Sequence, residues 1–303
     1  MLSSVEPSQP LPVYFIGHAG VGLLFDDRPV LQSARANLRE IGEEILSLSP
    51  RPKAIVVFSG HFEAGEIHGP GVIEVNVKKK TYIQASLPNT WHDFVNDFHD
   101  SRPFVYEYDW PHQDAPVLVT QIWQHLRQAG IKAKRVERGV DHGVWVPFKV
   151  MFPEDRPLDI PLVQISTFHG YDLESQIRWG RLYNRCGFLI LGSGMAVHSF
   201  ASIQEIADAP RDEEREAVRA KVLSECRNFD THLRTAVTKK DGRERKKALL
   251  NSEVLYEFRR SNPTVEHFTP LLVAAGAAGD AEVVPLGTDL VEPGMSYLNL
   301  RFS

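Results

Sequence analysis

The sequence predicts an α/β domain with a central, mostly parallel mixed β-sheet flanked by helices. Apolar runs of strand length alternate along the chain with segments whose apolar residues recur at helical spacing. The run 54–58 is continuously apolar, which is typical of a strand buried on both faces of a parallel sheet. Two such strands are followed by a Gly-His pair. We therefore expect an active site at the carboxyl edge of the strands, where open α/β sheets bind ligands.

The individual elements follow from local pattern and from the residues that end each segment. Strands are predicted at 12–16, 54–58, 71–77, 132–137, 161–166, 187–191 and 296–302. Helices are predicted at 33–48, 117–130, 173–186 and 211–235, and a short helix or turn at 145–151. The remaining segments are expected to be a long loop at 87–116 with a helical piece at 91–98, and exposed turns at the basic stretches 78–80 and 239–247.

Length and composition indicate one globular domain. The chain has 303 residues, of which 43% are hydrophobic and 24% charged, close to an average soluble protein. We expect a single catalytic domain over 1–303, with residues 1–11 as a flexible N-terminus. A chain of this length buries a large core without help, so a bound metal would be functional rather than structural.

Charge and cysteine content exclude several classes. The net charge of −5 gives no general field that attracts nucleic acid or anionic membranes, so neither is an expected partner. Cys186 and Cys226 are too few for a disulfide framework or a zinc finger. The N-terminus lacks the pattern of a signal peptide, and no apolar stretch approaches the roughly 20 residues of a membrane span. The expected compartment is the cytoplasm, and the pattern predicts no oligomeric state.

Two of the twelve histidines occupy equivalent positions. His18 and His61 each follow a hydrophobic strand and a glycine, at the edge where such sheets bind ligands. Neutral imidazole is a common ligand of iron and zinc. A single histidine at a strand end is more often a hydrogen-bonded core residue, and the pair makes the two interpretations about equal. Four other histidines are expected on the surface: His68, His99, His125 and His232.

Three further histidines stand beside turns or apolar segments. His198 follows the glycine-rich stretch 192–194, which is either a plain turn or a phosphate-type loop that lacks the P-loop lysine. His142 lies near Trp145, and a turn histidine packed on an aromatic ring is the simpler interpretation of it alone. His267 begins an apolar segment, where a helix-start histidine is the simple alternative. The chain contains no HExxH, CxxC or GxSxG motif, which disfavours common proteases, redox enzymes and serine hydrolases.

Taken in chain order, these segments resemble the class III extradiol ring-cleaving dioxygenases, in particular the DOPA 4,5-dioxygenase-like branch. The resemblance covers nearly the whole chain and rests on the segments 15–18, 51–61, 106–111, 138–147, 192–198 and 266–272. The stretch 138–147, RGVDHGVWVP, is the most specific. Two departures bear on substrate more than on fold. Residues 19–21 are Ala-Gly-Val where the family often has Gly-Ser-Pro, and the charged segment 211–247 looks longer than in compact bacterial members.

The resemblance implies a metal-dependent oxidoreductase that opens a catechol-type, DOPA-like ring with O2. By that resemblance His18, His61 and His267 would bind one divalent metal, His198 would be the acid/base, and His142 would contact the substrate or oxygen. The metal would be Fe(II) for dioxygenase activity, and Zn(II) can occupy the same site in the isolated protein. The partners would be a small aromatic diol and O2.

Three His ligands would differ from the two-His, one-carboxylate set of many non-haem iron sites. Glu63 and Glu266 are the acids nearest in sequence to two proposed ligands, and either could orient a ligand or replace one. Two other functions fit the same residues: a zinc hydrolase on this scaffold, and a non-enzymatic metal- or ligand-binding protein. The five histidines disfavour the latter, because binding alone needs no acid/base.

Several aromatic and polar side chains are candidates either for a substrate pocket or for ordinary packing. They are Trp91, His92, Tyr106, Tyr108, Trp110 and Trp145, with His112 and His169 as weaker polar candidates.

Overall fold

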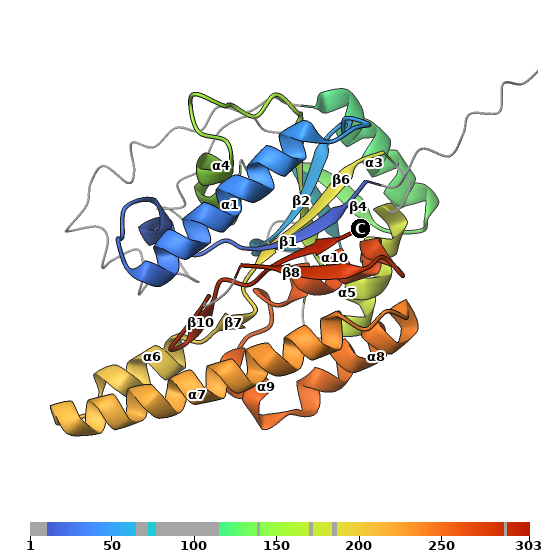
Figure 1. The fold of residues 1–303 in the computed structure, drawn as a ribbon. Helices are drawn as coiled ribbons and strands as arrows, with labels where there is room; N and C mark the ends of the chain where they lie inside the picture. The colour runs from blue at the N-terminus through green and yellow to red at the C-terminus, as the bar shows by residue number, and fades with distance from the viewer. Residues whose placement is uncertain are drawn as a thin grey trace, which may run out of the picture.

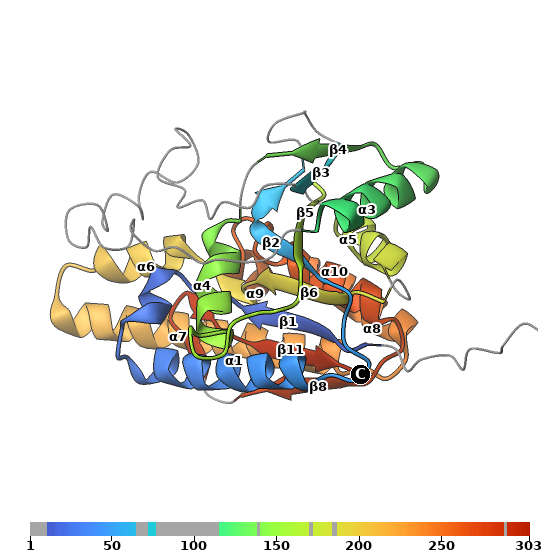
Figure 2. The same ribbon diagram turned by 90° about the horizontal axis from the view of Figure 1, so that it is seen from above.

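The computed structural model describes residues 11–64, 72–76, 115–137, 140–169, 172–183, 187–287 and 290–303. They form one α/β domain in which helices cover both faces of an eight-stranded sheet (Figure 1, Figure 2). Some predictions lie outside the described residues: nearly all of the flexible N-terminus, the turn at 78–80, the loop 87–114 with its helical piece, and the aromatic segment 106–111.

The large sheet has the strand order β4-β3-β5-β2-β6-β1-β11-β8. Its strands are β1 Val13–Gly17, β2 Ile55–Glu63, β3 Ile73–Asn76, β4 Ala133–Val136, β5 Leu162–Thr167, β6 Leu189–Gly194, β8 Val283–Leu286 and β11 Asn299–Phe302. The central strands β5, β2, β6 and β1 run parallel. Antiparallel pairs join β3 to β5, β11 to β1 and β8 to β11. The predicted mostly parallel mixed sheet is therefore confirmed.

Alternate residues of the central strands pack against two separate helical layers. In β1, Val13 and Phe15 belong to the core shared with α3, α5 and α10, whereas Tyr14 and Ile16 belong to the core shared with α1 and α4. Figure 2 shows α1 and α4 on one side of the sheet and α5 and α10 across it. The helices of these layers are α1 Pro29–Ser47, α3 Pro116–Gln128, α4 His142–Met151, α5 Leu173–Gly180 and α10 Thr269–Ala278.

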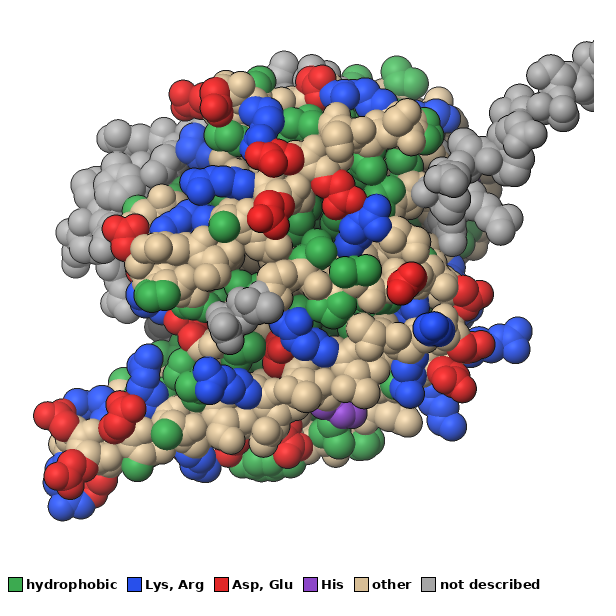
Figure 3. Space-filling view, viewed as in Figure 1, with side chains coloured by type: hydrophobic (Ala, Val, Ile, Leu, Met, Phe, Trp, Pro, Cys, Tyr) green, Lys and Arg blue, Asp and Glu red, His purple; other side chains and the backbone are tan. Residues whose placement is uncertain are grey.

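Four helices extend the molecule beyond the sheet: α6 Phe200–Ala207, α7 Asp212–Val237, α8 Gly242–Asn251 and α9 Tyr256–Ser261. A three-stranded sheet of order β7-β10-β9 lies beside them, with β7 Val197–His198, β9 Val291–Glu292 and β10 Met295–Ser296. Acidic and basic side chains are interspersed over the face in Figure 3, including the projecting end at its lower left. Among the described helices, none combines the length and the apolar character that crossing a bilayer requires.

The basic stretch 239–247 differs from its prediction as an exposed turn, because helix α8 begins within it. Asp241 caps this helix by accepting hydrogen bonds from two backbone N–H groups of its first turn. The Arg245 side chain is buried and donates to three backbone carbonyls, those of Lys239, Gly279 and Ala281. Arg245, which was expected to be exposed to solvent, therefore links α8 to the residues that follow α10.

Other boundaries differ from prediction as well, and two of them have a clear physical reason. Helix α1 begins at Pro29 rather than at residue 33, since proline suits the first turn, where its missing N–H costs no hydrogen bond. The predicted closing strand 296–302 is divided between β10, which pairs in the small sheet, and β11, which pairs with β1.

Candidate metal centre

The carboxyl ends of β1, β6 and β2 lie at one edge of the sheet and carry two of the predicted ligands. His18 directly follows β1, and its backbone N–H donates to the carbonyl of Gly194 at the end of β6 (3.1 Å). His61 lies within β2, which continues to Glu63 instead of ending near residue 58. Because β6 lies between β1 and β2, the two histidine-bearing strands are not neighbours in the sheet.

Both histidines follow a glycine because other backbone occupies the space of a side chain. A Cβ on Gly17 would lie 2.6 Å from Cα of Tyr297. A Cβ on Gly60 would lie 3.0 Å from Cα of His267. Gly60 lets β2 approach the segment that carries the third predicted ligand.

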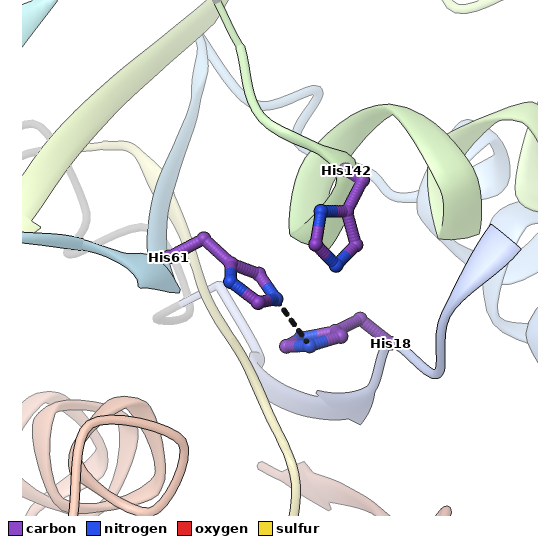
Figure 4. A group of neighbouring side chains, drawn as sticks. All are labelled: His18, His61 and His142. Atoms are coloured by element: carbon purple, nitrogen blue, oxygen red, sulfur yellow. Dashed lines mark hydrogen bonds between the residues drawn. The ribbon is translucent and has the colours of Figure 1, made fainter. Parts of the chain in front are cut away.

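The three predicted ligands converge through their Nε2 atoms. His61 Nε2 lies 3.1 Å from His18 Nε2 and 3.3 Å from His267 Nε2, and all three side chains are buried. Figure 4 shows the His18 and His61 rings directed at each other. Bonds of 2.0–2.1 Å from three nitrogens to one ion would place those nitrogens about 2.8–3.4 Å apart for octahedral to tetrahedral angles. The two separations from His61 Nε2 fit a shared divalent ion.

Hydrogen bonds at Nδ1 of His18 and His267 place the ring proton there, so the Nε2 atom of each ring carries a lone pair. The hydroxyl of Ser193 donates to the carbonyl of Gly143, so it accepts from Nδ1 of His18 (3.2 Å). Nδ1 of His267 donates to Oε1 of Glu266 (3.0 Å). A neutral imidazole carries one N–H, so both Nε2 atoms are acceptors. His61 Nε2 carries at most one proton, which it would have to share between the Nε2 atoms of His18 and His267. A cation can instead accept a lone pair from all three nitrogens.

Burial and hydrogen bonding together favour the protonation states that a metal site needs in His18, His61 and Glu266. Burial, followed by the effect of neighbouring histidines, lowers the pKa of His18 and His61 well below its ordinary value. Burial alone would raise the pKa of Glu266, but hydrogen bonds from His267 and Thr264 outweigh it and lower that pKa. Near neutral pH the two imidazoles are neutral and the carboxylate is ionised.

The other two predicted site residues flank the cluster. His198 lies in β7 and stacks on His267, with ring centroids 3.6 Å apart and planes inclined by 12°. Burial lowers its pKa well below the ordinary value. His142 is the first residue of α4, which begins there rather than at Trp145. Its ring centroid lies 3.9 Å from that of His61, and Figure 4 shows its ring above the His18–His61 pair. The fold thus brings all five histidines together.

Comparison with known proteins gives the family. Residues 13–300 match the family model described as the catalytic LigB subunit of aromatic ring-opening dioxygenase. The chain belongs to the LigB family.

Individual relatives agree with this assignment. A 4,5-DOPA dioxygenase extradiol-like protein of Schizosaccharomyces pombe is 31% identical over 241 residues, covering 77% of this chain and 71% of the relative. A 4,5-DOPA dioxygenase extradiol of Beta vulgaris is 28% identical over 296 residues, covering 96% of each chain. The crystal structure of an uncharacterized protein from Escherichia coli K12 shares the fold, with a TM-score of 0.65 and 22% identity, covering 97% of this chain and 100% of that one. The family and these names support an extradiol-type, aromatic ring-opening dioxygenase.

Asp141 was not identified from the sequence of this LigB-family chain as a residue of the site. Asp141, 1% exposed, accepts hydrogen bonds from Ser59 Oγ (2.7 Å) and Gln164 Nε2 (2.6 Å). Ser59 Oγ in turn accepts from the backbone N–H of His61 (3.1 Å). Asp141 thereby ties the start of α4, where His142 lies, to the strand that carries His61. Its position next to His142 was the only sequence signal.

One other interpretation of the sequence needs correction, and the structure distinguishes between the alternatives left open at two further positions. Residues 192–194 form the end of β6 and neither a turn nor a phosphate loop. A Cβ on Gly192 would lie 2.3 Å from the carbonyl of Pro270, so these glycines let α10 pack on the strand. Trp145 is buried in the core with α1, in agreement with the ordinary-packing alternative. Glu63 pairs with the exposed His169 (2.7 Å), whereas Glu266 contacts a predicted ligand.

Proposed function

We propose that this LigB-family chain is a metal-dependent extradiol dioxygenase that opens the ring of a catechol-type, DOPA-like substrate with O2. The observation that carries the proposal is the convergence of the Nε2 atoms of His18, His61 and His267, with two further histidines beside them. The names of the relatives from Schizosaccharomyces pombe and Beta vulgaris support the substrate class.

The three converging imidazoles would hold one divalent ion, Fe(II) for dioxygenase activity. When bound, Fe(II) would supply open positions for a catecholate and O2 together with the redox activity that ring opening requires. The protein supplies fixed, neutral nitrogen donors. Ser193 and Glu266 set the tautomers of two of them before any ion arrives, so little reorganisation is needed on binding.

His198 is the proposed acid/base. Burial keeps its imidazole neutral near pH 7, so it can accept a proton from a catechol hydroxyl. The imidazolium formed then lies beside the reacting groups and can return that proton to an oxygen as the ring opens. Stacking on His267 holds the ring at the edge of the metal site throughout this exchange.

His142 is the proposed contact for the substrate or oxygen. It lies at the N-terminus of α4, where the helix dipole favours a negatively charged group. The network of Asp141, Ser59 and Gln164 fixes this helix end against β2 and β5. An anionic catecholate beside His142 would therefore meet a preorganised, partly positive environment.

Anaerobic reconstitution tests the proposal. The metal-free protein is loaded with Fe(II), mixed with L-DOPA, and then exposed to O2 in an oxygen electrode. The proposal predicts stoichiometric O2 consumption with a yellow ring-opened product, both dependent on Fe(II). If the Fe(II) protein consumed no O2 with a panel of catechols, while the Zn(II) protein hydrolysed esters or amides, the hydrolase alternative would replace it.

A further inference from the structure

We infer that Glu266 is a positioning residue of the metal centre: its carboxylate acts through the imidazole of His267 and strengthens metal binding without being a ligand. The inference deepens the proposed function and rests on it, because it requires His267 to be a ligand.

The side chains of Glu266 and His267 are in direct contact, and further hydrogen bonds fix the carboxylate and the backbone of both residues. Oε1 of Glu266 lies 3.0 Å from Nδ1 of His267 and 2.7 Å from Oγ1 of Thr264, which donates to it. The Glu266 carbonyl accepts from Oγ1 of Thr269 (2.9 Å) at the start of α10. The carbonyl of His267 accepts from the backbone N–H of Met195 (2.8 Å). Turning the Glu266 side chain away would break both of its hydrogen bonds, and the two backbone bonds fix the segment that carries both side chains.

The charge of Glu266 distinguishes His267 from His18. Nδ1 of His18 donates to the neutral hydroxyl of Ser193, whereas Nδ1 of His267 donates to a carboxylate. Hydrogen bonds with an ionised partner are roughly twice as strong as neutral ones. A carboxylate at Nδ1 also draws the ring proton towards itself and makes Nε2 a better donor to a cation.

This arrangement offers a reason why a site of three neutral ligands can serve chemistry usually carried by two histidines and a carboxylate. The negative charge is retained, but it reaches the ion through an imidazole. Glu63 provides a comparison, since it is the other acid next to a proposed ligand. Its carboxylate pairs instead with the exposed His169 (2.7 Å).

The test measures Zn(II) affinity by competition with a chromophoric chelator. Zn(II) alone is the probe, so the result does not depend on turnover. Glu266→Gln keeps the size of the side chain and removes its charge, and Glu63→Gln is the matched control. We expect Zn(II) binding about 10–100-fold weaker in Glu266→Gln and unchanged in Glu63→Gln. Glu266→Asp, which retains the charge, should recover part of the loss.

The outcomes separate this inference from the proposed function. If the wild-type protein did not bind Zn(II) near one equivalent, the proposed metal centre itself would fail. If the wild type bound but Glu266→Gln bound equally well, only the inference would be overturned. Complete loss of binding in Glu266→Gln would also overturn it, in favour of direct ligation. Thr264→Val covers the case in which Glu266→Gln does not fold: weaker Zn(II) binding supports the inference, and unchanged binding contradicts it.

Discussion

The ring of His198 lies face to face with that of His267, 3.6 Å away between centroids and inclined by 12°. The ring of Phe200 packs against that of His198 in an edge-to-face arrangement, with the two centroids 4.7 Å apart. Since Glu266 fixes His267 and His267 supports His198, the proposed acid/base is oriented by packing on a proposed ligand. This division of roles gives different expectations for metal binding and for turnover.

Replacement of His198 separates the two roles. His198→Ala should retain Fe(II), because the three proposed ligands are untouched, and should lose about 100- to 10,000-fold in the rate of ring opening, as expected for loss of a general acid/base. Metal content and O2 uptake with L-DOPA measure the two effects. His232→Ala is the control, since His232 lies on α7 and contacts Ser252. Ring opening at the wild-type rate by His198→Ala would exclude the assigned role.

Buried neutral histidines make the metal-free protein sensitive to acid. The pKa of His18 and His61 is lowered in the folded state, so below about pH 6.5 the unfolded chain binds protons that the folded chain does not. Their contribution to stability is therefore present above that pH and is lost as the pH falls. Each should cost roughly 1–2 kcal/mol of unfolding free energy between pH 7.5 and 5.5.

Urea unfolding of the metal-free protein at the two pH values measures this effect. The double variant His18→Gln/His61→Gln is the reference, because its other titrating groups are the same. The wild type should lose about 3 kcal/mol more than the double variant on acidification. Equal losses in both proteins would show that these imidazoles are not held neutral.

Gly143 has no room for a side chain. A Cβ there would lie 2.5 Å from Ser59 Oγ, 3.0 Å from Cδ2 of His61 and 3.1 Å from Asp141 Oδ1. Gly143→Ala should therefore displace His61 or break the Asp141 network, costing about 1–3 kcal/mol of stability and weakening metal binding. Gly20→Ala is the control, since nothing lies within 4 Å of its Cβ position. Urea unfolding and Zn(II) competition check both variants, and equal behaviour of the two would contradict the packing argument.

The sequence predicted the elements that local pattern controls and missed those that distant contacts control. The strand–glycine–histidine units at His18 and His61 are local, and the fold places them as expected at the carboxyl edge. Arg245 could not be foreseen, because its carbonyl partners come from separate parts of the chain. The insertion of β6 between β1 and β2 likewise depends on pairing across the whole chain.

The same distinction applies to the site. All five histidines were named from sequence, but their roles came from a family resemblance and remain predictions. Choosing between Glu63 and Glu266 required the fold, since both acids lie close in sequence to a histidine. The buried network around Asp141 escaped notice because Ser59 and Gln164 have ordinary polar side chains in apolar strands.

The central claim is that one ion is shared by three imidazoles, and anomalous diffraction from crystals grown with Zn(II) tests it most directly. The account predicts a single strong peak per chain, within roughly 2.0–2.1 Å of the Nε2 atoms of His18, His61 and His267. A peak bonded instead to His142, or held between His198 and a Glu266 carboxylate oxygen, would contradict it.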